Sequence, residues 1–189
     1  MAKKFNPAVK EALLSRERTD VLDSHRVMSF LPLMPYHEVA DVGCGPGYFT
    51  IPLAKFAFDG KVYALDIHKE MLDAVREAAE RVRLANVETV LSKTTKVALP
   101  KESVDGAMVA FVLSEASKPS KILKDLHGVL RKGGWLAIIE WKHAGEKCGP
   151  SAEAQLSESA AAELAETAGF RFTGRYDVNP LHYMLVLRA

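Results

Sequence analysis

The chain has 189 residues, a length typical of one domain, and 48% of them are hydrophobic and 26% charged, as in an ordinary globular protein. A net charge of +1 argues against a nucleic-acid or acidic-membrane partner. No apolar run is long enough to span a bilayer, and Cys44 and Cys148 are too few for a disulfide framework or a four-cysteine zinc site. We therefore expect a cytoplasmic protein with no metal site and no membrane span.

The order of predicted elements indicates an α/β fold. Residues 1–36 are expected to form two short helices, the second from about Thr19 to Leu31, that could act as a lid. Residues 37–189 would complete a single domain, with strands at 37–43, 61–67, 86–91, 104–113, 135–141, 170–178 and 182–188. Helices are expected at 48–58, at 69–84, at 120–130 with Gly133-Gly134 as its end, and from Ser157 as N-cap to Gly169.

Alternation of strands and helices predicts a doubly wound parallel sheet with helices on both faces. The last two strands depart from this rhythm, because only residues 179–181 separate them. A connection so short cannot hold a crossover helix, so these strands are expected to form an antiparallel hairpin.

The stretch DVGCGPGYF, residues 41–49, contains Gly43, Gly45 and Gly47. A glycine loop between a strand and a helix is typical of nucleotide-binding sites, although a plain turn is the alternative. In the dinucleotide pattern G-x-G-x-x-G/A the last position would fall on Tyr48, whose ring would obstruct close approach of helix and strand. The loop therefore argues against NAD.

Asp66 ends the second expected strand. A carboxylate there can accept hydrogen bonds from both hydroxyls of a ribose. An Asp that only caps the next helix is the alternative reading. Because the same carboxylate would serve NAD equally well, the glycine loop and not Asp66 separates the two cofactors.

The pattern D-x-G-x-G-x-G, residues 41–47, resembles motif I of class I S-adenosylmethionine-dependent methyltransferases. VDGAMVAFVL (104–113) resembles the fourth strand of that family, LRKGGWLAIIEW (130–141) its fifth strand, and AGF (168–170) with the hairpin its reversed seventh strand. The chain is most similar to small members related to the ubiquinone/menaquinone-biosynthesis type. The resemblance implies a Rossmann-like sheet of order 3-2-1-4-5-7-6 with strand 7 antiparallel, S-adenosyl-L-methionine as cofactor and S-adenosyl-L-homocysteine as product.

The resemblance also implies which residues hold the cofactor. They are Asp41, Gly43, Cys44, Gly45, Gly47, Tyr48, Asp66, Ile67, Ser92, Lys93, Thr94, Phe111, Val112 and Leu113. Two departures affect the site. Family members often carry an adenine-binding Asp where this chain has residues 92–94, and often a His-Glu pair where it has Ser114-Glu115. A lysine cannot accept the adenine hydrogen bond.

Methyl transfer from a sulfonium needs alignment of the acceptor and exclusion of water, and a general base only for a protonated acceptor. The predicted topology brings candidate base or substrate-orienting residues to one edge: Glu115, Glu140, His143, His182 and Tyr183. His68 could border the adenine, whereas His127 is expected at the surface. We therefore expect a methyltransferase for a small-molecule acceptor, as a monomer or homodimer. A non-catalytic cofactor-binding module and an NAD-linked oxidoreductase are the alternatives.

Overall fold

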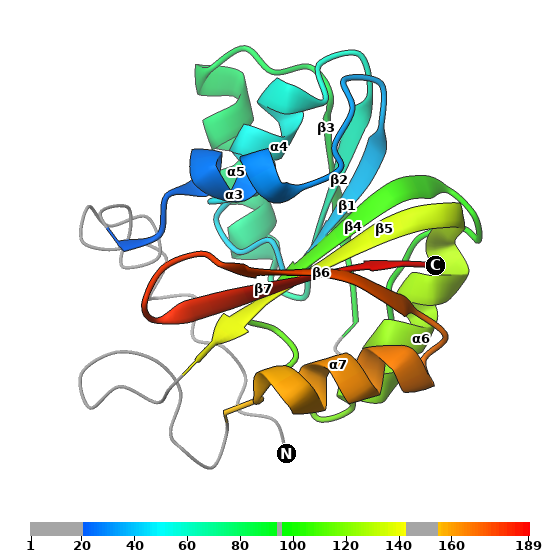
Figure 1. The fold of residues 1–189 in the computed structure, drawn as a ribbon. Helices are drawn as coiled ribbons and strands as arrows, with labels where there is room; N and C mark the ends of the chain where they lie inside the picture. Colours follow the sequence, from blue (N-terminus) through cyan, green and yellow to red (C-terminus); the bar gives the residue numbers. More distant parts are fainter. Residues whose placement is uncertain (1–20, 94–95, 143–154) are drawn as a thin grey trace.

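The computed structural model describes residues 21–93, 96–142 and 155–189. Its sheet has the order β3-β2-β1-β4-β5-β7-β6 (Figure 1). The strands are β1 (Glu38–Val42), β2 (Lys61–Asp66), β3 (Val87–Leu91), β4 (Val104–Ala110), β5 (Leu130–Trp141), β6 (Arg171–Asp177) and β7 (His182–Arg188). The described helices are α3 (Ser24–Phe30), α4 (Thr50–Phe56), α5 (Lys69–Arg81), α6 (Pro119–Val129) and α7 (Glu158–Thr167).

Strand direction confirms the predicted topology. β1 pairs in parallel with β2 and β4, β2 with β3, and β4 with β5. β7 is antiparallel to both of its neighbours, β5 and β6. The carboxyl ends of β1, β2, β4 and β5 therefore meet at one edge of the sheet, and the start of β7 lies at that edge too.

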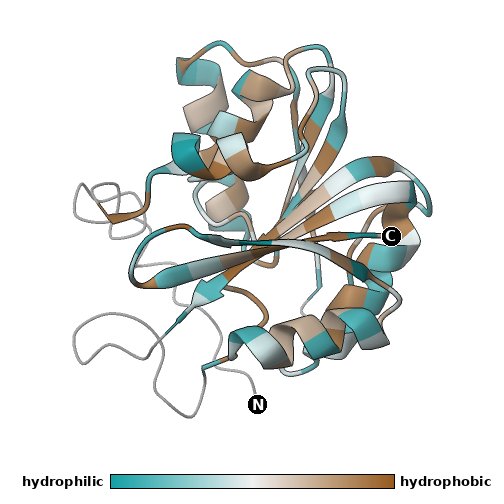
Figure 2. Ribbon diagram, in the orientation of Figure 1, coloured by the Kyte–Doolittle hydropathy of each residue, from teal (hydrophilic) through white to brown (hydrophobic). Residues whose placement is uncertain are grey.

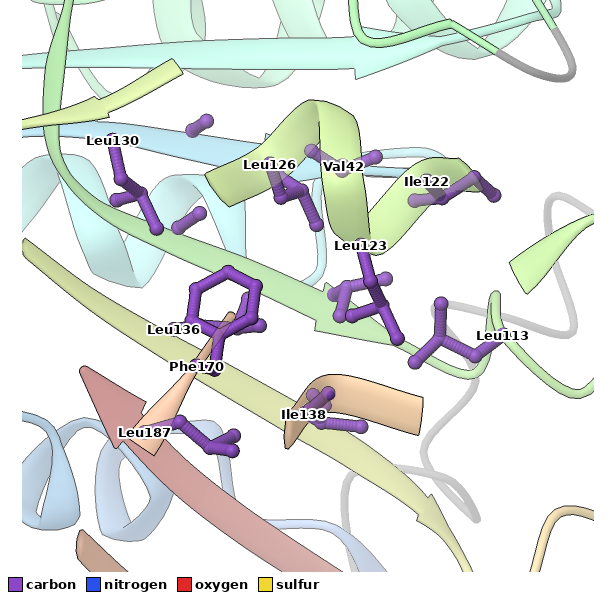
Figure 3. Packing of buried hydrophobic residues seen from close by; sticks show 14 of the residues in the cluster. Val42, Leu113, Ile122, Leu123, Leu126, Leu130, Leu136, Ile138, Phe170 and Leu187 are labelled. Atoms are coloured by element: carbon purple, nitrogen blue, oxygen red, sulfur yellow. The ribbon is translucent and has the colours of Figure 1, made fainter. Parts of the chain in front are cut away.

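Helices cover both faces of the sheet, as predicted. On one face Leu123 and Leu126 of α6 pack with Leu136 and Ile138 of β5, in a cluster that also contains residues of α7 (Figure 3). On the other face α3 and α4 share a cluster with alternate residues of the same strands. Figure 2 shows hydrophobic residues along the central strands, where they pass between the two layers of helices.

The prediction that Gly133-Gly134 ends a helix is wrong. α6 ends at Val129 because Leu130 is already extended, and β5 begins there. Both glycines lie inside β5, where its register against β4 shifts between Val104 and Gly106. Gly133 has a φ of +77°, and a Cβ on Gly134 would lie 2.9 Å from a backbone oxygen. These glycines serve a β-bulge rather than a helix end.

Capping residues explain where α7 begins and ends and where α3 begins. The side chain of Ser157 accepts a hydrogen bond from the amide of Ala160, and Gly169 has a φ of +104°, so the predicted cap and stop of α7 are confirmed. α3 is shorter than the predicted 19–31 helix, because Asp23 accepts from the amides of His25 and Arg26 and starts it there.

Other differences have local causes. The strand predicted at 104–113 ends at Ala110, because Phe111 has a φ of +60° that no strand allows. The helix predicted from residue 48 begins at Thr50. His127, expected at the surface, is half-buried, and its ring centroid lies 5.1 Å from that of Phe170. Among the described residues, no helix combines the length and the hydrophobicity needed to cross a bilayer.

Candidate active site

The glycine loop joins β1 to α4 at the carboxyl edge of the sheet. Gly43, Gly45 and Gly47 all have positive φ, of +72°, +53° and +95°. The amide of Gly43 donates to the carbonyl of Leu65 at 2.8 Å, which ties the loop to the end of β2. A Cβ on Gly43 would lie 2.3 Å from Cγ2 of Val112. The loop therefore requires glycine both for its backbone angles and for its contact with the segment after β4.

Asp66 ends β2 beside this loop and is only 8% exposed. Its carboxylate accepts from the amide of Gly45 at 3.0 Å through Oδ2 and from the amide of His68 at 2.9 Å through Oδ1. An ionised carboxylate can accept about four hydrogen bonds, so each oxygen retains capacity for one more donor. The pair of oxygens thus suits the two hydroxyls of a ribose.

Asp41 lies beneath the loop, at the end of β1, and is buried. The hydroxyl of Thr50 donates to its Oδ2 at 2.6 Å, which connects β1 to the first turn of α4. Burial raises the pKa of Asp41 to about 7, and the nearby charge of Asp66 adds to this effect. The sequence pattern identified Asp41 but gave no signal for Thr50 as its partner.

Cys44 and Tyr48 use their side chains away from the loop. The Cys44 side chain packs with Ala64, Leu72 and Val75, and burial raises the pKa of its thiol. Only the backbone of Cys44 is therefore left to face a ligand, and the thiol is not activated as a nucleophile.

Tyr48 donates its hydroxyl hydrogen to the carbonyl of Leu22. The glycine loop is thereby attached to the segment that precedes α3. This contact joins residues far apart in the chain, and no local pattern in the sequence indicated it.

The residues expected near the adenine lie where β2 and β3 end. The amide of Ser92 donates to the carbonyl of Asp66 at 2.8 Å, and its hydroxyl donates to the carbonyl of Lys96 at 2.6 Å. Lys93 is exposed, and Thr94 lies outside the described residues. Nε2 of His68 is buried and makes no hydrogen bond to any residue that the structure describes. The His68 ring nitrogen is therefore available to a polar group of a ligand.

Three aromatic rings meet at the ends of β4 and β5 and the start of β7. The centroid of Phe111 lies 5.6 Å from that of Trp141 and 5.0 Å from that of His182, and the last two are 4.2 Å apart. His182 stands opposite Trp141 in the β5–β7 register and is 3% exposed. We call Phe111, Trp141 and His182 the aromatic cluster. The positive φ of Phe111 is the kind of local strain that accompanies functional sites.

Glu140 is also buried, but it alternates with Trp141 along β5 and faces the layer of α6 and α7. Its carboxylate accepts from the amide of Ser114 at 3.1 Å and from the hydroxyl of Ser114 at 2.9 Å. Burial raises the pKa of Glu140 to about 7. Glu140 therefore fixes the segment after β4, in which Leu113 is buried toward α6 (Figure 3).

The other described candidates, Tyr183 and Glu115, are not part of the aromatic cluster. The hydroxyl of Tyr183 donates to the carbonyl of Leu156 at 2.9 Å, and the ring is buried in the core on the α7 side. The side chain of Glu115 is exposed. His143 lies outside the described residues. Of the predicted acceptor-side residues that the structure describes, His182 is the one that lies among the rings.

Comparison with known proteins agrees with this geometry. Residues 40–138 match the family described as "Methyltransferase domain". A SAM-dependent methyltransferase from Aquifex aeolicus is 32% identical, with a TM-score of 0.91 over 98% of this chain and 99% of that one. A SAM-dependent methyltransferase from Methanosarcina mazei shares the fold, with a TM-score of 0.67 at 18% identity over 86% of this chain and 95% of that one.

Curated relatives match over a shorter range. A demethylmenaquinone methyltransferase from Geobacillus stearothermophilus is 29% identical over 115 residues, 60% of this chain and 49% of that protein. One from Listeria welshimeri is 31% identical over 104 residues, 54% of this chain and 44% of that protein. The match thus spans about half the length of these relatives. With the family match extending over more than half of its residues and the Aquifex structure matched along almost all of them, the chain belongs to the class I S-adenosylmethionine-dependent methyltransferases.

Proposed function

We propose that this protein transfers the methyl group of S-adenosylmethionine to a small-molecule acceptor. The observation that carries the proposal is the placement of Asp66, whose carboxylate is held by the amides of Gly45 and His68 and keeps an acceptor position free on each oxygen. Such a carboxylate beside a glycine loop fits the ribose of a nucleoside cofactor that brings no phosphate to the loop.

The residues present fit the cofactor of the family. Asp66 would accept hydrogen bonds from the ribose hydroxyls, and the backbone of residues 43–47 would lie against the methionine portion. His68, through its buried Nε2, and Ser92, through its hydroxyl oxygen, would border the adenine. Val112, which packs on Gly43, would flank the cofactor from the β4 side.

The bound cofactor supplies a methyl group on a good leaving group, so the protein's task is alignment and exclusion of water. The rings of Phe111 and Trp141 form an apolar wall at the sheet edge, which limits the access of water. The curated relatives named demethylmenaquinone methyltransferases support an acceptor that is a small molecule. Because they match over about half of their length, we do not carry over their particular substrate.

Calorimetric titration with S-adenosylmethionine, S-adenosylhomocysteine and NAD tests the cofactor. Asp66→Asn removes the charge that the ribose hydroxyls would meet. Hydrogen bonds to charged groups contribute about 1.5–3 kcal/mol, so we expect S-adenosylmethionine to bind about 10- to 150-fold more weakly. Asp73→Asn is the matched control, because the ion pairs of Asp73 within the described residues are with exposed Lys69 and Arg76 on α5. NAD binding without S-adenosylmethionine binding would overturn the proposal.

Transfer is tested with radiolabelled methyl groups and a metabolite extract as the source of acceptors. We expect a labelled small molecule whose formation requires the intact Asp66. Cofactor binding that leaves every small molecule unlabelled would favour the non-catalytic module instead.

A further inference from the structure

We propose that Asn179 fixes His182 as the neutral imidazole with its proton on Nε2, so that His182 offers the acceptor molecule a hydrogen-bond donor and cannot act as its general base. Asn179 lies in the turn between β6 and β7, three residues before His182. The role toward an acceptor rests on the proposed function, whereas the position of the proton is a property of the chain itself.

The orientation of the Asn179 amide is settled by its neighbours. Its Oδ1 accepts from the amides of Leu181 at 2.8 Å and His182 at 2.9 Å. Its Nδ2 donates to the carbonyl of Val21 at 2.8 Å. Turning the amide over would set its NH2 against two N–H donors and its oxygen against a carbonyl. Two independent sets of contacts therefore require the same orientation.

That orientation determines the tautomer of His182. Nδ2 of Asn179 lies 2.9 Å from Nδ1 of His182. An amide NH2 can only donate, so Nδ1 must carry its lone pair and accept. The ring proton then resides on Nε2. A second proton on Nδ1 would face the amide hydrogens, so the same contact also opposes the imidazolium form. Nε2 therefore has a hydrogen to donate and no lone pair with which to take a proton.

The place of His182 gives this tautomer a function. Its ring lies in the aromatic cluster, where β4 and β5 end, on the opposite side of the sheet from Tyr183. A donor set among apolar rings can orient an oxygen or another electron-pair donor of the acceptor molecule. It cannot remove a proton from that molecule, so an acceptor that arrives protonated must lose its proton to another group.

The turn that carries Asn179 is held by Lys142 and by the segment before α3. Lys142 donates to the backbone carbonyl of Asn179 at 3.0 Å and forms an ion pair with Asp177. The bond to Val21 connects the turn to the segment before α3. Both amide hydrogens of Asn179 are used, one on Val21 and one on His182. Asn179 is thus a positioning residue, and it acts through His182.

The tautomer is measured by long-range ¹⁵N–¹H correlation spectra of the full chain labelled at histidine nitrogens, with His182 assigned through His182→Gln. We expect a protonated Nε2 and an unprotonated Nδ1 in the protein as it exists. Asn179→Asp replaces the donor with an oxygen, which should move the proton to Nδ1. Arg171→Gln, an exposed change on β6 of the same hairpin, is the control and should leave the tautomer unchanged. A wild-type spectrum with the proton of the assigned His182 ring on Nδ1 would overturn the inference even if Asn179→Asp did not fold.

Kinetics test the role. Glutamine keeps a donor and alanine does not, so His182→Gln should retain at least tenfold more kcat/KM than His182→Ala, with the loss expressed mainly in KM. The pH profile of kcat/KM should keep its shape in His182→Gln. Equal losses in both variants, or a limb of the profile that disappears, would mean that His182 is a base. Calorimetry with S-adenosylmethionine is carried out on the unaltered protein and on both variants. No cofactor binding by the unaltered protein would mean that the proposed function is wrong, whereas normal binding by all three would confine the failure to the role of His182.

Discussion

Gly43 is the residue at which the backbone and the packing of the site are both constrained. Its φ is +72°, and a Cβ there would lie 2.3 Å from Cγ2 of Val112. Left-handed backbone costs an L-residue about 1–2 kcal/mol and overpacking about 1–3 kcal/mol. We expect Gly43→Ala to lower the free energy of unfolding, measured in urea, by about 2–5 kcal/mol and to weaken binding of S-adenosylmethionine.

The control for that change is Gly128→Ala in α6, where a Cβ would meet open space. Alanine is favoured over glycine in a helix by about 1 kcal/mol. The control should therefore be equally stable or slightly more stable than the unaltered protein. An equal effect at both positions would contradict the close packing of the glycine loop.

Glu140 predicts a pH dependence with a definite sign. Its pKa is raised from 4.5 to about 7. Between pH 4.5 and pH 7, Glu140 is therefore protonated in the folded state and ionised in the unfolded chain. Its contribution to stability is complete below pH 4.5 and is lost as the pH rises through 7. Each pKa unit corresponds to about 1.4 kcal/mol, so between pH 4.5 and 7 Glu140→Gln should gain about 3 kcal/mol relative to the unaltered protein. Urea unfolding at several pH values measures this, and parallel curves would refute it.

Residues whose role depends on local order were predictable. The glycine loop and Asp66 follow strands at fixed places, so the pattern of the chain located them. The partners of the buried polar groups were not predictable, because they come from separate segments. Ser114, which follows β4, meets Glu140 of β5, and Val21 meets Asn179 from near the other end of the chain. Short-range patterns in the sequence give no information about contacts between residues so far apart along the chain.

Among the elements, α3 and the residues just before it connect the glycine loop to the hairpin, through Leu22 and Phe30. α3 has seven residues, and Asp23 caps it by accepting from two amides. Phe30 stacks on Tyr176 of β6, with centroids 4.7 Å apart. We expect Asp23→Ala to cost about 1 kcal/mol and to speed hydrogen exchange of the α3 amides. Ser29→Ala, a change on the exposed side of the same helix, should alter stability by less than about 0.5 kcal/mol; exchange that is equally fast in both variants would argue against the cap.

The elements themselves were largely predictable, because apolar spacing distinguishes strands from helices and a three-residue turn allows only a hairpin. The misplaced end of α6 shows the limit of this reasoning. A glycine pair indicates unusual backbone but does not say whether that backbone ends a helix or bulges a strand. Pairing of Leu130 with Val104, before the glycines, shows that they lie inside the strand.

At the scale of the whole molecule, ligand binding should appear as added stability. A ligand at 100 times its Kd stabilises the folded state by about 2.7 kcal/mol. For a domain of this size, that corresponds to a rise in Tm of about 5–10 °C. We expect S-adenosylmethionine to produce this shift in thermal unfolding, NAD to produce none, and Asp66→Asn to lose most of it at the same concentration. An equal shift with NAD would contradict the cofactor assignment.

The placement of β7 also has a consequence for how the protein is made. β7 follows β6 along the chain, yet it lies between β5 and β6 in the sheet. During synthesis some forty residues, from Trp141 to His182, must be added after β5 before its neighbour β7 begins. Throughout that interval the nascent chain exposes the edge of a long apolar strand, which is the kind of surface that draws chaperones or aggregates. The arrival of β7 closes that edge and delivers His182 to the aromatic cluster in the same event.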